Sequence, residues 1–261
     1  MTGSIGDALA RLYDVDLVEE PGDLDLYLAL AARAGGPVLE LAAGSGRLAV
    51  ALAEAGHAVT ALDIDPAMLG RLRRRAAAAD RATRDRLTIV EGDLLDIPAE
   101  VAGRGPFGLA FIALNSLFLL ATRDAQREAF RSMARHLETG GLAVADVWLP
   151  DAEDLARFDG RMMLEYDRDD PDSGRRVTKI AAAQHVASTG IVNLTSIYEE
   201  GDQGQPATRH VRRDVLRLVS AAELEDFATS AGLEVETVAG DYDLGPLGAG
   251  GDRAIVVAHK L

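Results

Sequence analysis

The sequence predicts an α/β fold, a doubly wound and mostly parallel seven-stranded sheet that also carries an antiparallel β insertion. Through the first 150 residues, short apolar runs alternate five times with segments of helical periodicity. Residues 160–218 instead alternate apolar and polar side chains between turn sequences, and one helix and two apolar runs follow. Strands that alternate with helices are typical of a parallel sheet covered on both faces, whereas strands joined by tight turns are typical of hairpins.

The N-terminal segment, residues 7–34, has helical periodicity that Pro21-Gly22 divides in two, and Gly35-Gly36-Pro37 ends it. Asp65-Pro66 has the residue types of an N-cap and a first helical position, and Gly140-Gly141 is expected to stop the helix before it. The expected strands are 38–41, 58–62, 87–91, 107–114 and 142–148, and the expected helices are 48–55, 66–79 and 124–137.

The insertion is expected to contain four antiparallel strands, at residues 161–167, 177–186, 191–199 and 208–219, with turns at 170–174, 188–190 and 201–206. Ser220 and Glu223 have the spacing of a capping box for a helix at 221–231, and strands at 233–239 and 254–259 follow. We therefore divide the chain into a helical segment 1–36, an α/β core 37–150, an insertion 151–218 and a C-terminal part 219–261.

The composition limits the function classes. Acidic residues outnumber basic residues by 42 to 27, which argues against nucleic acid or an anionic membrane as the main partner. Without cysteine the chain has no disulfide, thiolate zinc site or cysteine nucleophile, and no other metal-site pattern stands out. No run of about 20 apolar residues and no signal-peptide pattern occurs, so we expect a cytoplasmic protein.

A glycine loop lies between the first strand and the following helix. Residues 44–49 match the pattern G-x-G-x-x-[GA], which brings a nucleotide close to the backbone at a helix N-terminus. Asp63 follows Gly46 by 17 residues and suits a ribose hydroxyl, so the pattern is compatible with NAD. Two acids favour another cofactor: Glu40 precedes the glycines, and Asp93 follows the third strand.

In the combined pattern, the sequence resembles the class I S-adenosylmethionine-dependent methyltransferases over nearly its whole length. Ala42 replaces a glycine of the family's first motif, Asp65 replaces a serine of the second, and Thr139 replaces a proline of the fifth. The segments that carry the resemblance are residues 38–47, 62–69, 91–93, 113–117 and 136–141.

The resemblance implies roles in binding the adenosine part of S-adenosylmethionine. Asp63 would hold the ribose hydroxyls, while Ile64 and Met68 would pack near the adenine or ribose. Asp93 and Leu94 would hold the adenine ring.

For the methionine part, the resemblance implies backbone contacts from Ala42, Gly44 and Gly46 and from the carbonyl of Ala113. Tyr13 resembles a tyrosine that caps the methionine carboxylate in small-molecule methyltransferases, and the alternative for Tyr13 is plain helix packing.

For two further residues of the expected cofactor site, two different roles are compatible with the sequence. Glu40 either contacts the cofactor or braces the loop through backbone N–H groups, and Arg47 either binds the cofactor carboxylate or pairs with a surface acid.

Acceptor-binding residues are expected at the strand ends and in the insertion. Asn115 and Trp148 follow the fourth and fifth strands, and Asn115-Ser116 resembles the N-S pair of glycine- and sugar-amine-type N-methyltransferases. Tyr166 and Tyr198 are candidates from the insertion, and Tyr166 and His185 are weak catalytic candidates. Core packing is the alternative for Trp148 and Tyr198, and an ordinary sheet position is the alternative for His185.

The expected function is direct methyl transfer from S-adenosylmethionine to a small-molecule acceptor in bacterial secondary metabolism, at nitrogen first and at oxygen or carbon as alternatives, with S-adenosylhomocysteine as product. Such a transfer depends mainly on orientation of the reactants and needs no fixed catalytic residue. The insertion would cover the acceptor or form a homodimer contact. An NAD-dependent oxidoreductase and a non-catalytic S-adenosylmethionine-binding subunit remain as alternatives.

Overall fold

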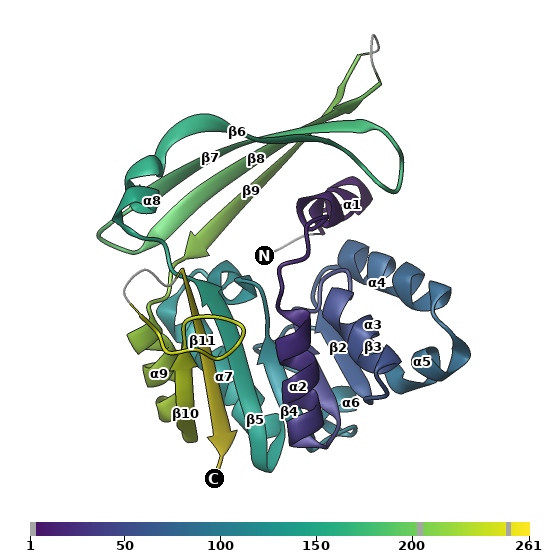
Figure 1. The fold of residues 1–261 in the computed structure, drawn as a ribbon, viewed down its shortest axis with the longest axis vertical. Helices are drawn as coiled ribbons and strands as arrows, with labels where there is room; N and C mark the ends of the chain where they lie inside the picture. Colours follow the sequence, from purple (N-terminus) through teal and green to yellow (C-terminus); the bar gives the residue numbers. More distant parts are fainter. Residues whose placement is uncertain (1–3, 203–205, 249–251) are drawn as a thin grey trace.

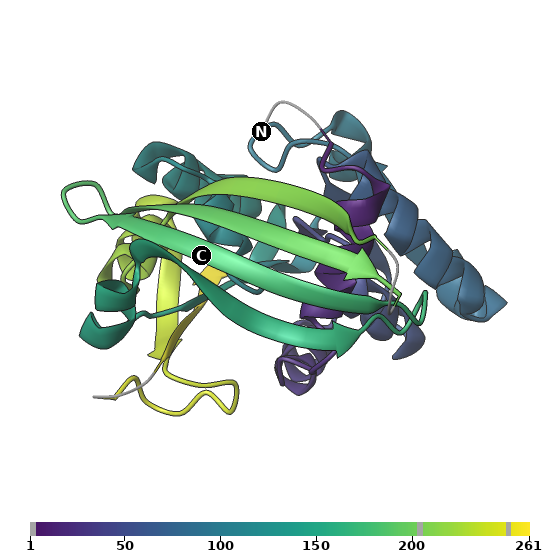
Figure 2. The same ribbon diagram turned by 90° about the horizontal axis from the view of Figure 1, so that it is seen from above.

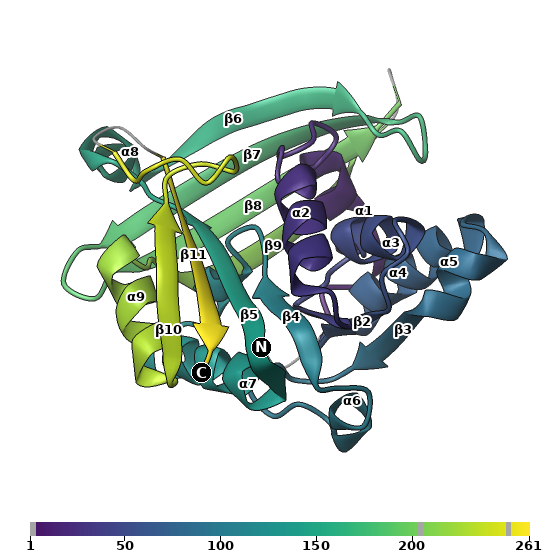
Figure 3. The same ribbon diagram turned by 60° about the horizontal axis from the view of Figure 1, so that its bottom comes forward.

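The main sheet has seven strands, and it forms the centre of the α/β core (Figures 1 and 3). The computed structural model describes residues 4–202, 206–248 and 252–261. Strands β1 to β5 run parallel to one another, whereas β11 is antiparallel to both β10 and β5. In spatial order the strands are β10 (Leu233–Ala239), β11 (Arg253–Lys260), β5 (Leu137–Trp148), β4 (Phe107–Ile112), β1 (Val38–Leu41), β2 (Val59–Asp63) and β3 (Leu87–Glu91).

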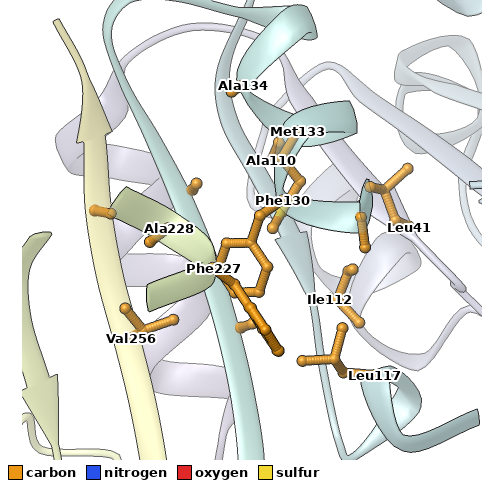
Figure 4. Close-up of a cluster of buried hydrophobic side chains, with 14 of the residues drawn as sticks. Leu41, Ala110, Ile112, Leu117, Phe130, Met133, Ala134, Phe227, Ala228 and Val256 are labelled. Atoms are coloured by element: carbon orange, nitrogen blue, oxygen red, sulfur yellow. The ribbon is translucent and has the colours of Figure 1, made fainter. Parts of the chain in front are cut away.

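Helices cover both faces of this sheet and create two apolar clusters. One cluster joins the sheet to α2 (Leu24–Ala34), α3 (Arg47–Glu54) and α4 (Pro66–Ala78). The other joins it to α6 (Ala99–Ala102), α7 (Arg123–His136) and α9 (Ala221–Ser230). In the second cluster the rings of Phe130 and Phe227 lie 6.0 Å apart, next to Leu41, Ile112 and Val256 (Figure 4).

The insertion forms a separate four-stranded antiparallel sheet that lies over the carboxyl edge of the parallel strands (Figures 1 and 2). This architecture is the one predicted from the alternation of apolar and polar residues. Its strands in order are β6 (Asp159–Asp169), β7 (Arg176–Val186), β8 (Ile191–Gly201) and β9 (Thr208–Arg217).

Helix α1 (Asp7–Asp16) lies between the insertion and the core (Figure 1). On its core side Asp14 accepts a hydrogen bond from Ser45 at 2.5 Å and pairs with Arg71 of α4. On its insertion side Arg11 pairs with Asp170 and Glu200. Because polar contacts hold both sides of the helix, α1 fastens the two sheets to each other.

A buried carboxylate, Asp146 of β5, holds the carboxyl edge together. It accepts hydrogen bonds from Tyr27 of α2 at 2.6 Å, from the backbone N–H of Leu114 at 3.0 Å and from Arg253 of β11 at 2.8 Å. The hydroxyl of Tyr242, in the segment between β10 and β11, is a fourth donor at 3.3 Å. A side chain without exposure to solvent needs such partners, because a buried unpaired charge is strongly destabilising.

Several sequence expectations are confirmed, and the caps show why. Asp65 accepts the backbone N–H groups of Ala67 and Met68, so it is the N-cap of α4. Ser220 and Glu223 form the predicted capping box of α9.

The expectation for Gly140-Gly141 was wrong. Helix α7 already ends at His136, and both glycines lie inside β5 at a bulge where the pairing shifts from Phe107↔Leu137 to Leu109↔Leu142. A Cβ on Gly141 would lie 2.9 Å from the carbonyl oxygen of Phe107, so the close approach of β4 explains this glycine better than a helix stop does.

Strand β4 is shorter than expected, and four short elements were not predicted. β4 ends at Ile112 because Leu114 and Asn115 turn into the left-handed region, with φ of 49° and 63°. α5 and α8 are polar segments without apolar periodicity, and α6 and η1 have four residues each, too few to show any period. The unpredicted elements are α5 (Arg81–Arg86), α6, η1 (Ser116–Leu119) and α8 (Ala152–Arg157), and residues 203–205 of the expected turn 201–206 lie outside the described residues.

The glycine loop between β1 and α3 contains three left-handed residues: Ala42 (φ 56°), Gly44 (φ 56°) and Gly46 (φ 80°). A Cβ on Gly44 would make only an ordinary contact, 3.9 Å from Cε1 of Tyr13, whereas a Cβ on Gly46 would lie 2.4 Å from Cγ of Leu72 in α4. Gly46 therefore serves the close packing of α3 on α4. Ala42 bears a side chain in a conformation that favours glycine.

Replacing Ala42 by Gly is expected to increase the free energy of unfolding by about 0.5–1 kcal/mol. Relief of left-handed strain, roughly 1–2 kcal/mol, exceeds the entropy that glycine adds to the unfolded chain. Urea unfolding followed by circular dichroism measures the difference. A loss of stability would show that contacts of the Ala42 methyl group outweigh its strain.

Replacing Gly46 by Ala is expected to destabilise the fold by about 2–4 kcal/mol, because the new methyl group adds a steric clash with Leu72 to the backbone strain. Gly35→Ala is the matched control, since Gly35 also has a positive φ of 72° but nothing within 4 Å. Equal losses in the two variants, measured by urea unfolding, would rule out the packing role of Gly46.

Candidate active site

Three adjoining cavities lie at the carboxyl edge of the main sheet. We call them the glycine-loop cavity, of about 210 Å³, the loop-side cavity, of about 30 Å³, and the sheet cavity, of about 480 Å³. The first two share Tyr13, Ala42 and Ser116 as lining residues. Asn115, the residue before Ser116, lines the sheet cavity, so all three cavities meet where the chain leaves β4.

The glycine-loop cavity contains a carboxylate that the backbone holds in place. Asp63, at the end of β2, accepts the N–H of Gly44 at 2.7 Å with one oxygen and the N–H of Asp65 at 2.8 Å with the other. Burial raises the pKa of Asp63, although these hydrogen bonds act against the shift. The carboxylate lines the cavity in a fixed orientation, as a group that receives hydroxyl donors requires.

Apolar side chains and a second acid complete this cavity. Ile64 is 45% exposed although it is a large aliphatic residue, and it lines the cavity together with Met68 and Leu94. Asp93, after β3, also lines the cavity and accepts the N–H of Leu95 at 2.8 Å. Such walls can hold a flat apolar ring that also bears polar groups.

The loop-side cavity contains a carboxylate oxygen without a partner. Glu40, in β1, is buried, and its Oε2 accepts no hydrogen bond from any described residue. Burial raises the pKa of Glu40 to about 8. If Glu40 only braced the loop through backbone N–H groups, its Oε2 would still be buried without a hydrogen-bond partner. Contact with the cofactor, the other alternative, would give this oxygen a partner.

Arg47 and Tyr13 also line the loop-side cavity. Arg47 donates to both carboxylate oxygens of Asp23 at 2.6 Å, and Asp23 has no exposure to solvent. Arg47 also lies 3.6 Å from Glu20, which is exposed, so the expected pairing with a surface acid is present beside the pairing with a buried one. The phenol of Tyr13 has its pKa raised by burial to about 12, so it is a neutral donor at physiological pH.

The sheet cavity lies between the insertion and the rim of the core. Asn115 accepts the N–H of Trp148 with Oδ1 at 2.5 Å, which joins the ends of β4 and β5, and both residues line the cavity as predicted. Phe158 lies 6.0 Å from the Trp148 ring and extends the aromatic wall.

The other candidates from the insertion do not line this cavity. The hydroxyls of Tyr166 and Tyr198 donate to the two oxygens of Asp16 in α1 at 2.7 Å and 2.8 Å, and Nζ of Lys179 lies 3.0 Å from the same carboxylate. Burial next to this carboxylate raises the pKa of both tyrosines. His185 is half-buried, and it lies outside the lining residues of all three cavities.

Of the remaining residues expected at the cofactor site, some line one of these cavities and one does not. Ala42 and Gly44 line the glycine-loop cavity, and Ala113 lines the loop-side cavity. Gly46 lines none of the three, because it packs against Leu72. Arg212 of β9, which the sequence analysis missed, extends from the insertion to the glycine-loop cavity.

Asp146 and Asp16 were also missed. For Asp146 a signal existed, since it is the single charged residue in the buried run of residues 142–148. For Asp16 the sequence held no signal, because its tyrosine partners come from strands 150 and 182 residues away.

Two further searches were negative for the residues that the structure describes. No group of three or more His, Asp or Glu side chains is arranged to hold a metal ion there. The helices in the same residues are too short or too polar to cross a membrane.

Comparison with known proteins agrees with this arrangement. Residues 38–141 match the family described as Methyltransferase domain. The cypemycin N-terminal methyltransferase of a Streptomyces species is 28% identical over 235 residues, which cover 87% of this chain and 84% of that protein.

Two solved structures are similar over almost the whole chain. The CcbJ methyltransferase from Streptomyces caelestis has a TM-score of 0.76 at 23% identity and covers 98% of both chains. The glycopeptide N-methyltransferase MtfA, complexed with S-adenosylhomocysteine, has a TM-score of 0.57 at 26% identity and covers 95% of this chain and 97% of its own. These similarities identify residues 38–141 as a methyltransferase domain, and together with the glycine loop and the sheet order they support a class I S-adenosylmethionine-dependent methyltransferase.

Proposed function

We propose that the glycine-loop cavity holds the adenosine part of S-adenosylmethionine and that the loop-side cavity holds its methionine part. The fit is supported by two features of the chain itself. Gly44 lines the glycine-loop cavity without a side chain, so a ligand can approach its backbone closely. The unpartnered oxygen of Glu40 offers an acceptor beside the same loop, where an ammonium group would satisfy it.

In the glycine-loop cavity, Asp63 would accept the ribose hydroxyls, because its carboxylate lines the cavity in an orientation that backbone N–H groups fix. Ile64, Met68 and Leu94 would pack on the adenine, and Asp93 would accept its amino group. The exposure of Ile64 supports this role, since a bound ring would cover it.

In the loop-side cavity, Glu40 and the carbonyl of Ala113 would face the amino group, and Tyr13 would donate to the carboxylate. Arg47 already forms two hydrogen bonds with Asp23, so its role is to hold the segment before α2 against the loop and to lend positive charge to the cavity.

We propose further that the sheet cavity holds a small-molecule acceptor and that the insertion covers it. Asn115 and Trp148 would orient the acceptor at the junction of the three cavities, and Arg212 would close the cofactor side from above. The names of the cypemycin and glycopeptide relatives favour nitrogen as the methylated atom and a natural product as the acceptor. A cytoplasmic location and a homodimer built through the insertion belong to the same proposal.

Methyl transfer requires mainly that the chain orient the acceptor toward the methyl group of the cofactor. The cofactor, when bound, supplies a methyl group on a sulfonium, which is reactive toward a lone pair. The residues of the three cavities would align the acceptor with that group and exclude water, which can account for most of the rate enhancement. No side chain is assigned as a general base, because a neutral amine needs none.

Replacing Asp63 by Ala is expected to weaken the binding of S-adenosylhomocysteine at least tenfold, because the ribose hydroxyls lose their acceptor. Isothermal titration calorimetry measures the affinity, and circular dichroism verifies the fold. Asp63→Asn, which keeps one oxygen acceptor for the loop, separates loss of the charge from collapse of the loop.

Asp85→Ala is the control, since Asp85 is exposed on α5 and outside all three cavities. Unchanged affinity in the Asp63 variants would refute the assigned role. Tight binding of NAD without binding of S-adenosylhomocysteine by the unmodified protein would refute the cofactor assignment, whereas binding without turnover of any acceptor would favour a non-catalytic subunit.

Glu40 gives a pH-dependent prediction. Its pKa is raised from the ordinary range near 4.3 to about 8, so between these values the folded protein holds a proton that the unfolded chain has lost. The free energy of unfolding therefore falls as the pH rises through this window. Glu40→Gln is expected to flatten that decline between about pH 5.5 and about pH 8 in urea unfolding. An identical decline in both proteins would show that Glu40 is ionised in the fold throughout.

A further inference from the structure

The sheet cavity contains one carboxylate that no described residue pairs with, and it belongs to Glu165 of β6. We propose that Glu165 receives a cationic amino group of the acceptor and thereby selects an amine as the substrate. This inference rests on the proposed function and refines it to one chemical class of acceptor and one residue that recognises it.

Met163 and Glu165, two residues apart on β6, both line the cavity, so alternation places Glu165, and a β-bulge turns the next residue to the same side. Strands β6 and β7 pair Leu164 with Ile180 and then Tyr166 with Lys179, so Glu165 is an extra residue without a partner of its own. A bulge allows two successive side chains to face the same side of a sheet. Here Glu165 lines the cavity and Tyr166, the next residue, also faces the core and bonds to Asp16.

The other charged groups of the cavity already have partners in the protein. The carboxylate of Asp154 accepts the backbone N–H of Asp151 at 3.1 Å. Each of the three cations lies next to an acid: Arg157 is 2.5 Å from Glu153, Arg161 is 3.1 Å from Asp159, and Lys179 is 3.0 Å from Asp16. Among the described residues that line the cavity, Glu165 is therefore the charged group without a hydrogen-bond or ion-pair partner in the protein.

The surroundings of Glu165 suit an ammonium group that is attached to an apolar body. Trp148, Phe158 and Met163 form apolar walls, and aromatic faces attract cations as well as carbon. The formal charge of −15 for the whole chain draws cations toward its surface. The role assigned to Glu165 is recognition of the cationic form. Water takes the proton from nitrogen before the transfer, because only the neutral amine has a lone pair for the methyl group.

The fluorescence of a residue in the sheet cavity can be used to measure binding of amines. Trp148 is the single tryptophan, and it lines the sheet cavity, so its fluorescence responds to a ligand bound there. Benzylamine, benzyl alcohol and benzoate have one ring and differ in charge. They are titrated separately at neutral pH, with S-adenosylhomocysteine present, into the unmodified protein, Glu165→Gln and Glu225→Gln.

The unmodified protein is expected to bind benzylamine roughly tenfold more tightly than benzyl alcohol, and benzoate least. Glu165→Gln is expected to reduce this preference to near unity. Glu225→Gln is the matched control and keeps the preference, because Glu225 is an exposed residue of α9 outside the cavity. Tightest binding of benzoate, an unmodified protein that responds no more to benzylamine than to benzyl alcohol, or a preference that survives in Glu165→Gln would overturn the proposal.

Calorimetry with S-adenosylhomocysteine separates this proposal from the one that precedes it. The Glu165→Gln variant is expected to bind S-adenosylhomocysteine as the unmodified protein does, because Glu165 lines neither the glycine-loop nor the loop-side cavity. If S-adenosylhomocysteine binds but the amine preference is absent, only the role of Glu165 fails. If S-adenosylhomocysteine does not bind to the unmodified protein, the cofactor site itself is misplaced.

Discussion

The buried carboxylate of Asp146 is the interaction on which the carboxyl edge of the sheet depends. Its hydrogen-bond donors come from α2, from the chain after β4, from β11 and from the segment before β11. Removal of one partner from a buried charge typically costs about 3–5 kcal/mol, so these segments are held to one another. The backbone carbonyl of Asp146 also accepts the N–H of Asn115 at 3.2 Å, which fixes the point where the three cavities meet.

Three buried carboxyl groups lie at the carboxyl edge of the main sheet or in the strands that lead to it. Burial raises the pKa values of Glu40, Asp63 and Asp146, so the folded chain keeps carboxyl groups in places that disfavour their charged form. A cationic ligand relieves this unfavourable arrangement, because it stabilises the ionised form. The excess of acidic residues therefore includes buried carboxyl groups that a cationic ligand would stabilise, in addition to surface residues that favour solubility.

Sequence reasoning predicted the main sheet and the insertion because both depend on short-range patterns. Apolar runs predicted the seven strands of the main sheet, and alternation predicted the four strands of the insertion. Most expected cofactor residues lie together for a topological reason, since loops after adjacent parallel strands meet at one edge. Short-range patterns did not predict α5 and α8, which are short and polar, or α6 and η1, which have four residues each. They also did not predict the bulge that contains Gly140-Gly141.

The acceptor side was harder to predict for a related reason. Alternation tells which residues share a face of a strand, but it does not tell what lies opposite that face. Tyr198 shares a face with the cavity residues of β8, and a bulge turns Tyr166 to the same side, yet Asp16 of a distant helix binds both of them. Gly46 fits a nucleotide-binding pattern, but the side chain of Leu72 explains it, and that side chain comes from α4.

Helix α1 makes the two halves of the site mechanically dependent on each other. Tyr13 lines the glycine-loop cavity and the loop-side cavity. Asp16, about one turn further along the same helix, contacts Lys179, Tyr166 and Tyr198 of the insertion. An outward swing of the insertion must either break these contacts or carry the helix, with Tyr13, away from the glycine loop. A movement of the insertion that widens the sheet cavity would therefore also act on Tyr13, through a single helix of ten residues.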